Sequence, residues 1–310
     1  MPHKIPRCQV VPLPGDQVAF RVDGTERLRW HFGGQYPRPF FYPLTGPSGA
    51  ELTRMGHPGD YSHDHHRSVW FAHHKVMGLD FWSDRTTTRI RQKRWLAYKD
   101  DDRECAMAAL LGWHDGHNAE LMEQELVAAV QPGSDGEILV ELQSTFRPTG
   151  KELTLEKSNF GLLAVRMAKD LSAHFGGGKI TNNEGQEDEE NVFNQPARWV
   201  DYSGPVIADA VEGITYIDHP TNPGQPTRWH VREDGWMGAS LCRDSEVTFT
   251  QENPLTVRYL LYVHAGPSRP LLANRVAADF SRTGPYLVKR VRVPHRSYLI
   301  ERGPQTPSER

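Results

Sequence analysis

The stretch GEILVELQSTF, residues 136–146, indicates most clearly what kind of fold the chain adopts. Its apolar and polar side chains alternate, and successive residues of a strand point to opposite sides of a sheet. The pattern therefore predicts a strand with one face in the core. The two faces consist of Ile138, Val140 and Leu142 on one side and Leu139, Glu141 and Gln143 on the other.

Similar period-two patterns recur at 86–99, 256–266 and 286–293. The segment 119–130 has a composition that favours helix, but it lies between strand-like segments and is predicted as a strand. Gly- and Pro-rich turns such as QPGSDG at 131–136 separate the runs.

One segment, SRPLLANRVAADFSR at 268–282, has the spacing of a helix. Ser268 is its expected N-cap, and Pro270 suits the first turn. Many strands and one short helix near 270–281 predict an all-β fold, a sandwich of large antiparallel sheets. No repeat or linker divides the chain. We therefore expect a single β-sandwich domain over 1–302 and a frayed tail at 303–310.

The charge balance excludes some partners. The chain of 310 residues has 36 Lys and Arg against 39 Asp and Glu, a net charge of −3. This balance favours neither nucleic acid nor a membrane surface as a partner. No apolar run approaches the roughly 18 residues of a spanning helix. The three cysteines (Cys8, Cys105, Cys242) lie far apart, and no secretory signal is visible, so we expect a cytoplasmic protein.

The stretch SHDHHRSVWFAHH, residues 62–74, holds five of the fifteen histidines. If it is extended, His63, His65, Arg67 and His73 share one face. Three interpretations remain open: a strand with hydrogen-bonded histidines, a metal site that begins with His63 and His65, and an acid–base site. Histidine titrates near neutral pH and arginine binds oxygen atoms, so the pattern favours acid–base chemistry on a sugar.

Eight tryptophans accompany these histidines, and the dipeptide WH recurs at 30–31, 113–114 and 229–230. Large rings suit the apolar faces of sugars, although any single Trp is more often a core residue. The acidic segment 182–199 lacks a strand pattern and is predicted as a loop, with a mobile cover over the site as the alternative.

Several segments together resemble the bacterial family known as PmoA-like, whose function is undetermined. They span roughly residues 38–266 and include RPFFYPLTGPSG, HDHHRSVWFAHHKVMGLDFW, NFGLLAVRMA, ITNNEGQ, ARWVDYSGP, IDHPTNPGQPTRWHVREDG and PLTVRYLLYVHAG. The family name refers to a methane-oxygenase subunit that spans the membrane. This chain has no spanning segment, so that activity is rejected.

The resemblance implies a galactose-mutarotase-like supersandwich, as in sugar epimerases. It also implies a histidine acid and a carboxylate base, the latter unplaced here. The family motif DHPHHRG is altered at Ser62, Asp64 and Ser68, while its histidines and arginine are retained. The lost acidic residue at 62 weakens any transfer of its role.

We predict a carbohydrate-active enzyme that performs acid–base chemistry, with or without a metal, on a sugar or oxidised (keto) glycoside, of the epimerase or lyase type. The alternatives are a non-catalytic sugar-binding protein and a metal-dependent glycoside hydrolase. The expected partner is a small-molecule sugar, and no feature indicates an oligomeric state. No cofactor motif is present; a divalent metal on His63 and His65 is the one cofactor candidate.

The candidate catalytic residues are His63, His65, His66, Arg67, His73 and His264. The candidate substrate-binding residues are Trp70, Trp82, Asn182, Arg198, His219, Trp229 and His230.

Overall fold

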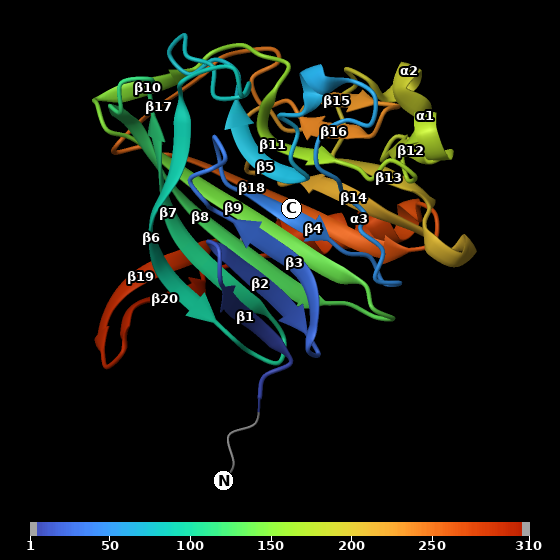
Figure 1. Cartoon of the computed structure of the whole chain (residues 1–310), viewed down its shortest axis with the longest axis horizontal. Coiled ribbons are helices and arrows are strands. Elements are labelled where there is room, and N and C mark those ends of the chain that lie inside the picture. The colour runs from blue at the N-terminus through green and yellow to red at the C-terminus, as the bar shows by residue number, and fades with distance from the viewer. Residues whose placement is uncertain (1–4, 306–310) are drawn as a thin grey trace.

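The alternating segments form two large antiparallel sheets that pack face to face (Figure 1). The structure, a computed structural model, describes residues 5–305. Strands account for about 51% of the chain and helices for about 9%. The predicted all-β class is confirmed. The assignment of 1–302 to one domain stays a prediction.

The first sheet has eight strands in the order β1-β2-β3-β4-β5-β11-β16-β15. Its strands are β1 (Cys8–Leu13), β2 (Gln17–Val22), β3 (Thr25–His31), β4 (Phe40–Leu44), β5 (Val69–His73), β11 (Gly161–Arg166), β16 (Trp236–Ala239) and β15 (Trp229–Arg232).

The second sheet also has eight strands, in the order β12-β13-β14-β18-β9-β8-β7-β6. Its strands are β12 (Lys179–Asn182), β13 (Trp199–Pro205), β14 (Val211–Asp218), β18 (Leu255–Ala265), β9 (Ile138–Pro148), β8 (Glu120–Pro132), β7 (Cys105–His114) and β6 (Arg89–Lys99).

Within residues 5–305, two further pairs of strands and three helices complete the fold. The pairs are β10 (Glu152–Leu155) with β17 (Val247–Thr250), and β19 (Tyr286–Val293) with β20 (Arg296–Arg302). The helices are α1 (Ala173–Gly176), α2 (Asp188–Val192) and α3 (Pro270–Arg282), and 3-10 turns lie at η1 (Tyr61–His63) and η2 (Ile207–Asp209).

The core lies between the sheets, and the predicted faces of β9 are confirmed. Val140 and Leu142 of β9 pack in the core with Tyr259 and Leu261 of β18. On the other face of β9, Glu141 forms an ion pair with Arg258, 2.8 Å between Nη2 and Oε1. One face of each strand thus builds the core, while the other carries polar groups outward.

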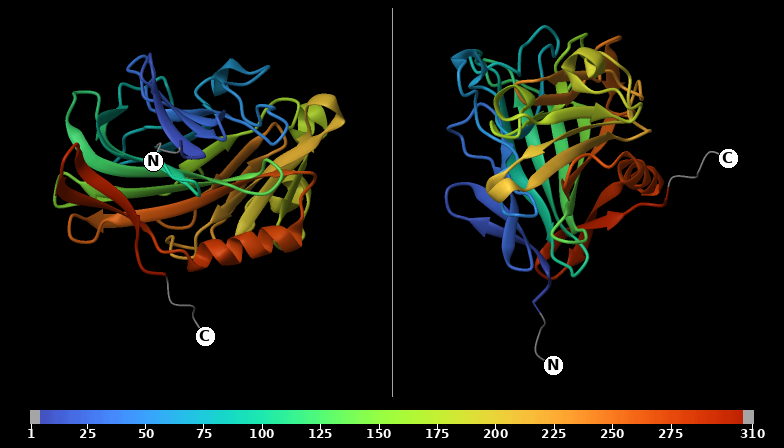
Figure 2. Two further views of the ribbon diagram at one scale, coloured as in Figure 1. Left: turned by 90° about the horizontal axis from the view of Figure 1, so that it is seen from below. Right: turned by 90° about the vertical axis from the view of Figure 1, so that its right-hand side faces the viewer.

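The outer face of the second sheet is covered by α3 and by the β19–β20 hairpin, as Figure 2 shows. Phe280 of α3 packs with Trp199 and Leu260. The helix agrees with the predicted 270–281, but its N-cap is Arg269, not Ser268, and that residue makes no side-chain capping bond. The predicted strand at 119–130 is confirmed as β8.

The predicted frayed tail begins at a residue that the fold holds in place. Of the predicted frayed tail, residues 306–310 lie outside the described residues, whereas the Gly303 N–H donates to the Pro285 carbonyl at 2.7 Å.

Within residues 5–305, no helix combines the length and the apolar character needed to cross a membrane.

The outer face of the first sheet carries an aromatic cluster that is separate from the main core. It contains Phe40, Trp70, Trp82 and Trp236 with two alanines. Strand alternation explains the separation, because Trp70 faces outward while its neighbours Val69 and Phe71 face the core. This cluster forms the base of the candidate site.

A buried ion pair ties together strands of the second sheet. His264 Nε2 lies 2.8 Å from Asp201 Oδ2, and the Thr215 hydroxyl donates to the same oxygen at 2.6 Å. Burial lowers the pKa of His264, but the hydrogen bond and the charge of Asp201 outweigh it, and the net pKa is raised.

We expect the His264–Asp201 pair to stabilise the protein more in acid than in base. The folded pKa lies above the unfolded value of about 6.5. The contribution is therefore complete below that value and is lost as pH rises through the folded pKa. In urea titrations, His264→Gln should lower the free energy of unfolding by about 3 kcal/mol at pH 6 and by less at pH 9. Equal losses at both pH values, or a similar loss for the exposed control His117→Gln, would contradict this.

Candidate functional site

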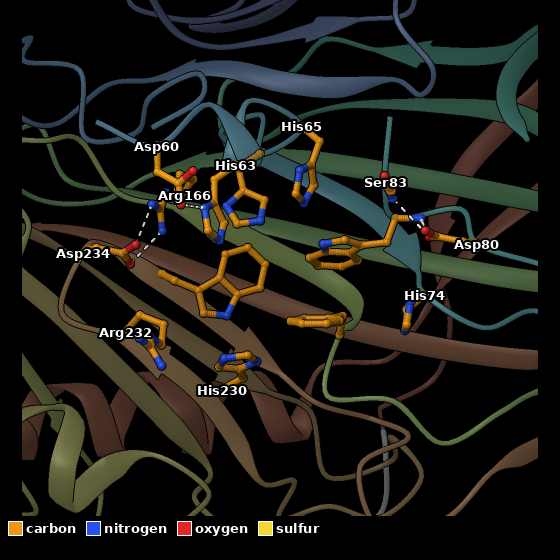
Figure 3. A pocket seen from close by; sticks show the side chains of 14 residues that line it. Asp60, His63, His65, His74, Asp80, Ser83, Arg166, His230, Arg232 and Asp234 are labelled. Carbon is orange, nitrogen blue, oxygen red and sulfur yellow. Dashed lines mark hydrogen bonds and ion pairs between the residues drawn. The ribbon is translucent and has the colours of Figure 1, made fainter. Parts of the chain in front are cut away.

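A cavity of about 580 Å³ opens above the aromatic cluster of the first sheet (Figure 3). Its volume lies within the range of small-molecule sites. Polar groups at both ends and aromatic rings between them line it. The lining residues are Asp60, His63, His65, His66, His74, Asp80, Trp82, Ser83, Phe160, Arg166, His230, Arg232, Asp234 and Trp236.

Four rings form what we call the aromatic wall: Trp70, Trp82, Phe160 and Trp236. Trp82 stacks on Phe160 with ring centroids 5.2 Å apart and meets Trp236 at 5.4 Å. Trp70 packs behind both at 5.5 Å and is fully buried. These mutual contacts fix the rings relative to one another. Trp82 and Trp236, 4% and 3% exposed, reach the cavity with a small part of their surface, and Phe160 is half-buried.

A histidine–carboxylate pair lies at one end of the cavity. Asp60 caps the η1 turn by accepting the Ser62 N–H at 2.9 Å, and its other oxygen lies 2.7 Å from His63 Nδ1. The hydrogen bonds to Ser62 and His63 lower the pKa of Asp60 to about 2. An ionised Asp60 favours the tautomer with the proton on Nδ1, which leaves Nε2 of His63 to face a ligand.

Two neighbouring histidines are kept neutral by burial. The His66 ring lies 4.8 Å from Trp236 and 5.4 Å from Trp70, and only 6% of the residue is exposed. Burial, reinforced by the positive charge of nearby Arg166, holds the pKa of His66 well below its usual value. Burial and the charge of Arg38 lower the pKa of His65 to about 4.

An arginine–aspartate pair lies at the same end of the cavity as His63 and Asp60. Arg166 of β11, 1% exposed, forms two parallel bonds with Asp234, at 2.9 Å and 3.0 Å. Asp234 also lies 3.2 Å from His57 Nε2. The His57 Nδ1 accepts the Gly59 N–H at 3.1 Å, so Nε2 carries the proton and donates to Asp234. The cluster fixes the position of the segment that carries Asp60 and His63.

The opposite end contains a turn and two further histidines. Asp80 accepts the N–H groups of Trp82 and Ser83, at 2.6 Å and 3.1 Å, which fixes the position of the indole. His230 stacks on Phe160 at 5.4 Å, and burial lowers its pKa to about 4. His74 meets the same ring edge-on at 5.8 Å.

The structure corrects the prediction that 63–74 is one extended strand. Residues 61–63 form the η1 turn, and β5 begins only at Val69. The turn breaks the alternation, so His63, His65 and His66 all line the cavity. His74, which directly follows β5, lines the cavity, while His73, the last residue of β5, is fully buried and contacts the Glu156 carbonyl at 2.9 Å. His74 therefore faces the site and His73 does not, the reverse of the prediction.

The other two catalytic candidates lie outside the cavity lining. Arg67 pairs with Asp84, 3.0 Å between Nη1 and Oδ1, and Arg38 shares that carboxylate at 2.9 Å. His264 lies in β18, on the outer face of the second sheet. The expectation that it completes the same site is wrong, because two sheets and the core separate it from the cavity.

Of the substrate-binding candidates, Trp82 and His230 line the cavity and Trp70 supports it. The other four are held by structural contacts elsewhere. Asn182 accepts the N–H groups of Glu184 and Gln186 in a turn. Arg198 and His219 contact Asn274 and Arg258 respectively. Trp229 is fully buried and donates to the Ala197 carbonyl at 2.8 Å.

Several lining residues were not predicted as site residues: Asp60, Asp80, Arg166, Asp234, Phe160 and Trp236 among them. A local signal existed for two of them. Asp60 and Asp80 each accept the backbone N–H of the residue two positions further on, as an aspartate does at the start of a turn. Arg166 and Asp234 meet only through strand pairing between β11 and β16, which the sequence does not show.

The metal candidates His63 and His65 have ring centroids 6.1 Å apart. Across residues 5–305, no group of three or more His, Cys, Asp or Glu side chains is arranged to hold a metal ion. A metal on His63 and His65 therefore stays a prediction that would need a ligand to complete the site.

The chain belongs to the family described as "Family of unknown function (DUF6807)", which matches residues 17–278. No curated protein matches the sequence.

Several solved structures share a general likeness with the chain. A candidate aldose 1-epimerase from Escherichia coli K12 has 14% identity and a TM-score of 0.36, with 84% of this chain and 99% of that chain covered. The GalM/aldose epimerase homologue from C. elegans has 6% identity and the same TM-score, over 83% and 98%. A candidate mutarotase from Salmonella typhimurium has 13% identity and a TM-score of 0.33, over 83% and 97%.

We expect the Arg166–Asp234 pair to be needed for stability. Asp234→Asn leaves a buried guanidinium with a neutral partner, which should lower the free energy of unfolding by about 2 kcal/mol in urea titrations at pH 7. Glu233→Gln makes the same charge change one residue away, on a side chain that is 60% exposed, and should have almost no effect. Similar losses in both variants would show that the pair has no special role.

Proposed function

We propose that the cavity binds a sugar or an oxidised (keto) glycoside and performs acid–base chemistry of the epimerase or lyase type. The observation that carries the proposal is the His63–Asp60 pair at the edge of the aromatic wall. It combines an oriented proton acceptor with a surface suited to a sugar ring.

The aromatic wall accounts for binding. A pyranose ring has an apolar C–H face and a rim of hydroxyl groups. The rings of Trp82, Trp236 and Phe160 offer the apolar contact surface, and polar groups surround them at both ends of the cavity. An apolar ligand would leave these polar groups without partners, which favours a ligand rich in hydroxyl groups.

His63 is the proposed base. With Nδ1 bound to Asp60, its Nε2 can remove a proton from an anomeric hydroxyl or from a carbon next to a carbonyl. The Asp60 carboxylate stabilises the imidazolium that forms. When the proton comes from a carbon, delivery of a proton to the opposite face of that carbon yields an epimer, and departure of a neighbouring group with its bonding electrons yields an unsaturated product. When it comes from an anomeric hydroxyl, the bond between C1 and the ring oxygen breaks, the ring oxygen takes up a proton, and closure on the other face of the carbonyl exchanges the anomers.

His66 and His65 are the proposed hydrogen-bond donors. An imidazole that stays neutral can donate an N–H to the oxygen that gains negative charge during proton removal. Nδ1 of His66 is buried without a partner. A buried N–H without a partner is costlier than a bare ring nitrogen, so the proton belongs on Nε2. Arg67, His73 and His264 have no part in this step, because they lie outside the cavity lining.

Two alternatives follow from the same cavity. A non-catalytic sugar-binding protein would use the wall and histidines only to hold hydroxyl groups. A metal-dependent glycoside hydrolase would require a metal at His63 and His65. ¹H NMR of the sugar in D₂O, with and without EDTA, separates all three. Deuterium uptake at carbon or exchange of anomers indicates the proposed activity, hydrolysis that EDTA abolishes indicates the hydrolase, and neither change indicates the binding protein.

Other proposals rest on the sequence. The PmoA-like resemblance is supported by the motifs from 38 to 266, and the mutarotase-like supersandwich by the two large sheets. A cytoplasmic location is supported by three buried cysteines that are all free.

We expect His63→Gln to lower the rate of proton exchange at least about 100-fold, a loss typical of removing a general base. The readout is ¹H NMR in D₂O with a panel of aldoses, glycosides and their 3-keto forms. Asp60→Asn should also lower the rate, because the amide stabilises the imidazolium less well. His117→Gln, in an exposed turn, should match the unaltered protein. Full activity in His63→Gln would exclude His63 as the base.

A further inference from the structure

Both arginines of the cavity lining are already paired with carboxylates. Arg166 is paired with Asp234 inside the lining. Arg232 is paired with Glu189 of α2, a residue outside the lining, at 3.3 Å between Nε and Oε1. Arg38 and Arg67 share Asp84 and do not line the cavity.

The remaining charges of the lining are negative. Asp60 is paired with His63, and Asp80 accepts two backbone N–H groups. The lining thus contains three aspartates against two arginines, and Glu189 adds a fourth carboxylate at the rim. An anionic ligand would meet an excess of negative charge with no arginine free to bind it.

The contacts of Glu189 hold it against the cavity rim. Its Oε2 accepts the Glu233 N–H at 2.6 Å, which positions the other oxygen beside Arg232. The Glu189 side chain is 24% exposed, whereas that of Arg232 is 55% exposed. Without Glu189, the Arg232 guanidinium would be the one lining cation free to bind a carboxylate or a phosphate.

We propose that Glu189 sets the specificity of the cavity for uncharged sugars, by neutralising Arg232, and so excludes uronates and sugar phosphates. The proposal rests on the proposed sugar-binding function and narrows its substrate class. It also assigns a role to the acidic segment 182–199, which supplies this carboxylate through α2.

The test uses pairs of methyl glycosides and the corresponding methyl glycosiduronates in the gluco, galacto and manno series. Their dissociation constants are measured by ligand-observed NMR at pH 7. The unaltered protein should bind the neutral member of a pair at least about tenfold more tightly. Glu189→Gln should narrow that ratio roughly threefold to tenfold, because it frees Arg232.

Two further variants test whether the freed Arg232 causes the change in the ratio of dissociation constants. Glu190→Gln makes the same charge change at an exposed position of α2 and should leave the ratio unchanged. Glu189→Gln combined with Arg232→Gln should restore the original ratio, because the freed cation is removed. Thermal unfolding confirms that each variant is folded.

The outcomes separate the two proposals. Preference of the unaltered protein for a uronate, or an equal effect from Glu190→Gln, overturns the role of Glu189 and leaves sugar binding in place. Binding of neither member of any pair overturns both proposals. Neutral preference that Glu189→Gln weakens and the double variant restores supports the proposal.

Discussion

The contact between imidazole and indole rings is the interaction on which the site depends. His66 lies against Trp70 and Trp236, and this burial holds its pKa well below the usual value. A charged imidazole would have to give up its hydration to occupy that place. The same wall therefore offers an apolar surface to a ligand and keeps the adjacent histidines neutral. His63, which is paired with Asp60, lies at the edge of this wall, and its side chain is 40% exposed.

The wall exists because strand alternation gives the first sheet two different faces. Trp70 and Trp236 point outward from β5 and β16, while Phe71 and Met237 point into the core. The second sheet uses its outer face differently: α3 and the β19–β20 hairpin cover it. Polar networks such as His264–Asp201 are enclosed there, so similar residue types have structural roles on one sheet and line a cavity on the other.

The sequence predicted the fold better than the site, for physical reasons. The alternation in 136–146 and 256–266 depends on nearest neighbours along a strand, and both segments form the predicted strands, β9 and β18. The site depends on a turn and on distant pairs. The prediction of one extended strand over 63–74 overlooked the turn that Asp60 caps, and it assigned His73 and His74 to the wrong faces. The meeting of Arg166 with Asp234 needs the pairing of β11 with β16, which no local pattern encodes.

The neutral state of the cavity histidines is tested most directly by a ¹H–¹³C NMR titration of their ring signals between pH 4.5 and 8.5, with and without a bound methyl glycoside. Burial predicts that His65 and His230, with pKa values of about 4, stay neutral through most of this range. Their ring signals should shift when the glycoside binds. Protonation of either ring near the ordinary value of about 6.5 would contradict the account, because the wall would then fail to exclude water from its histidines.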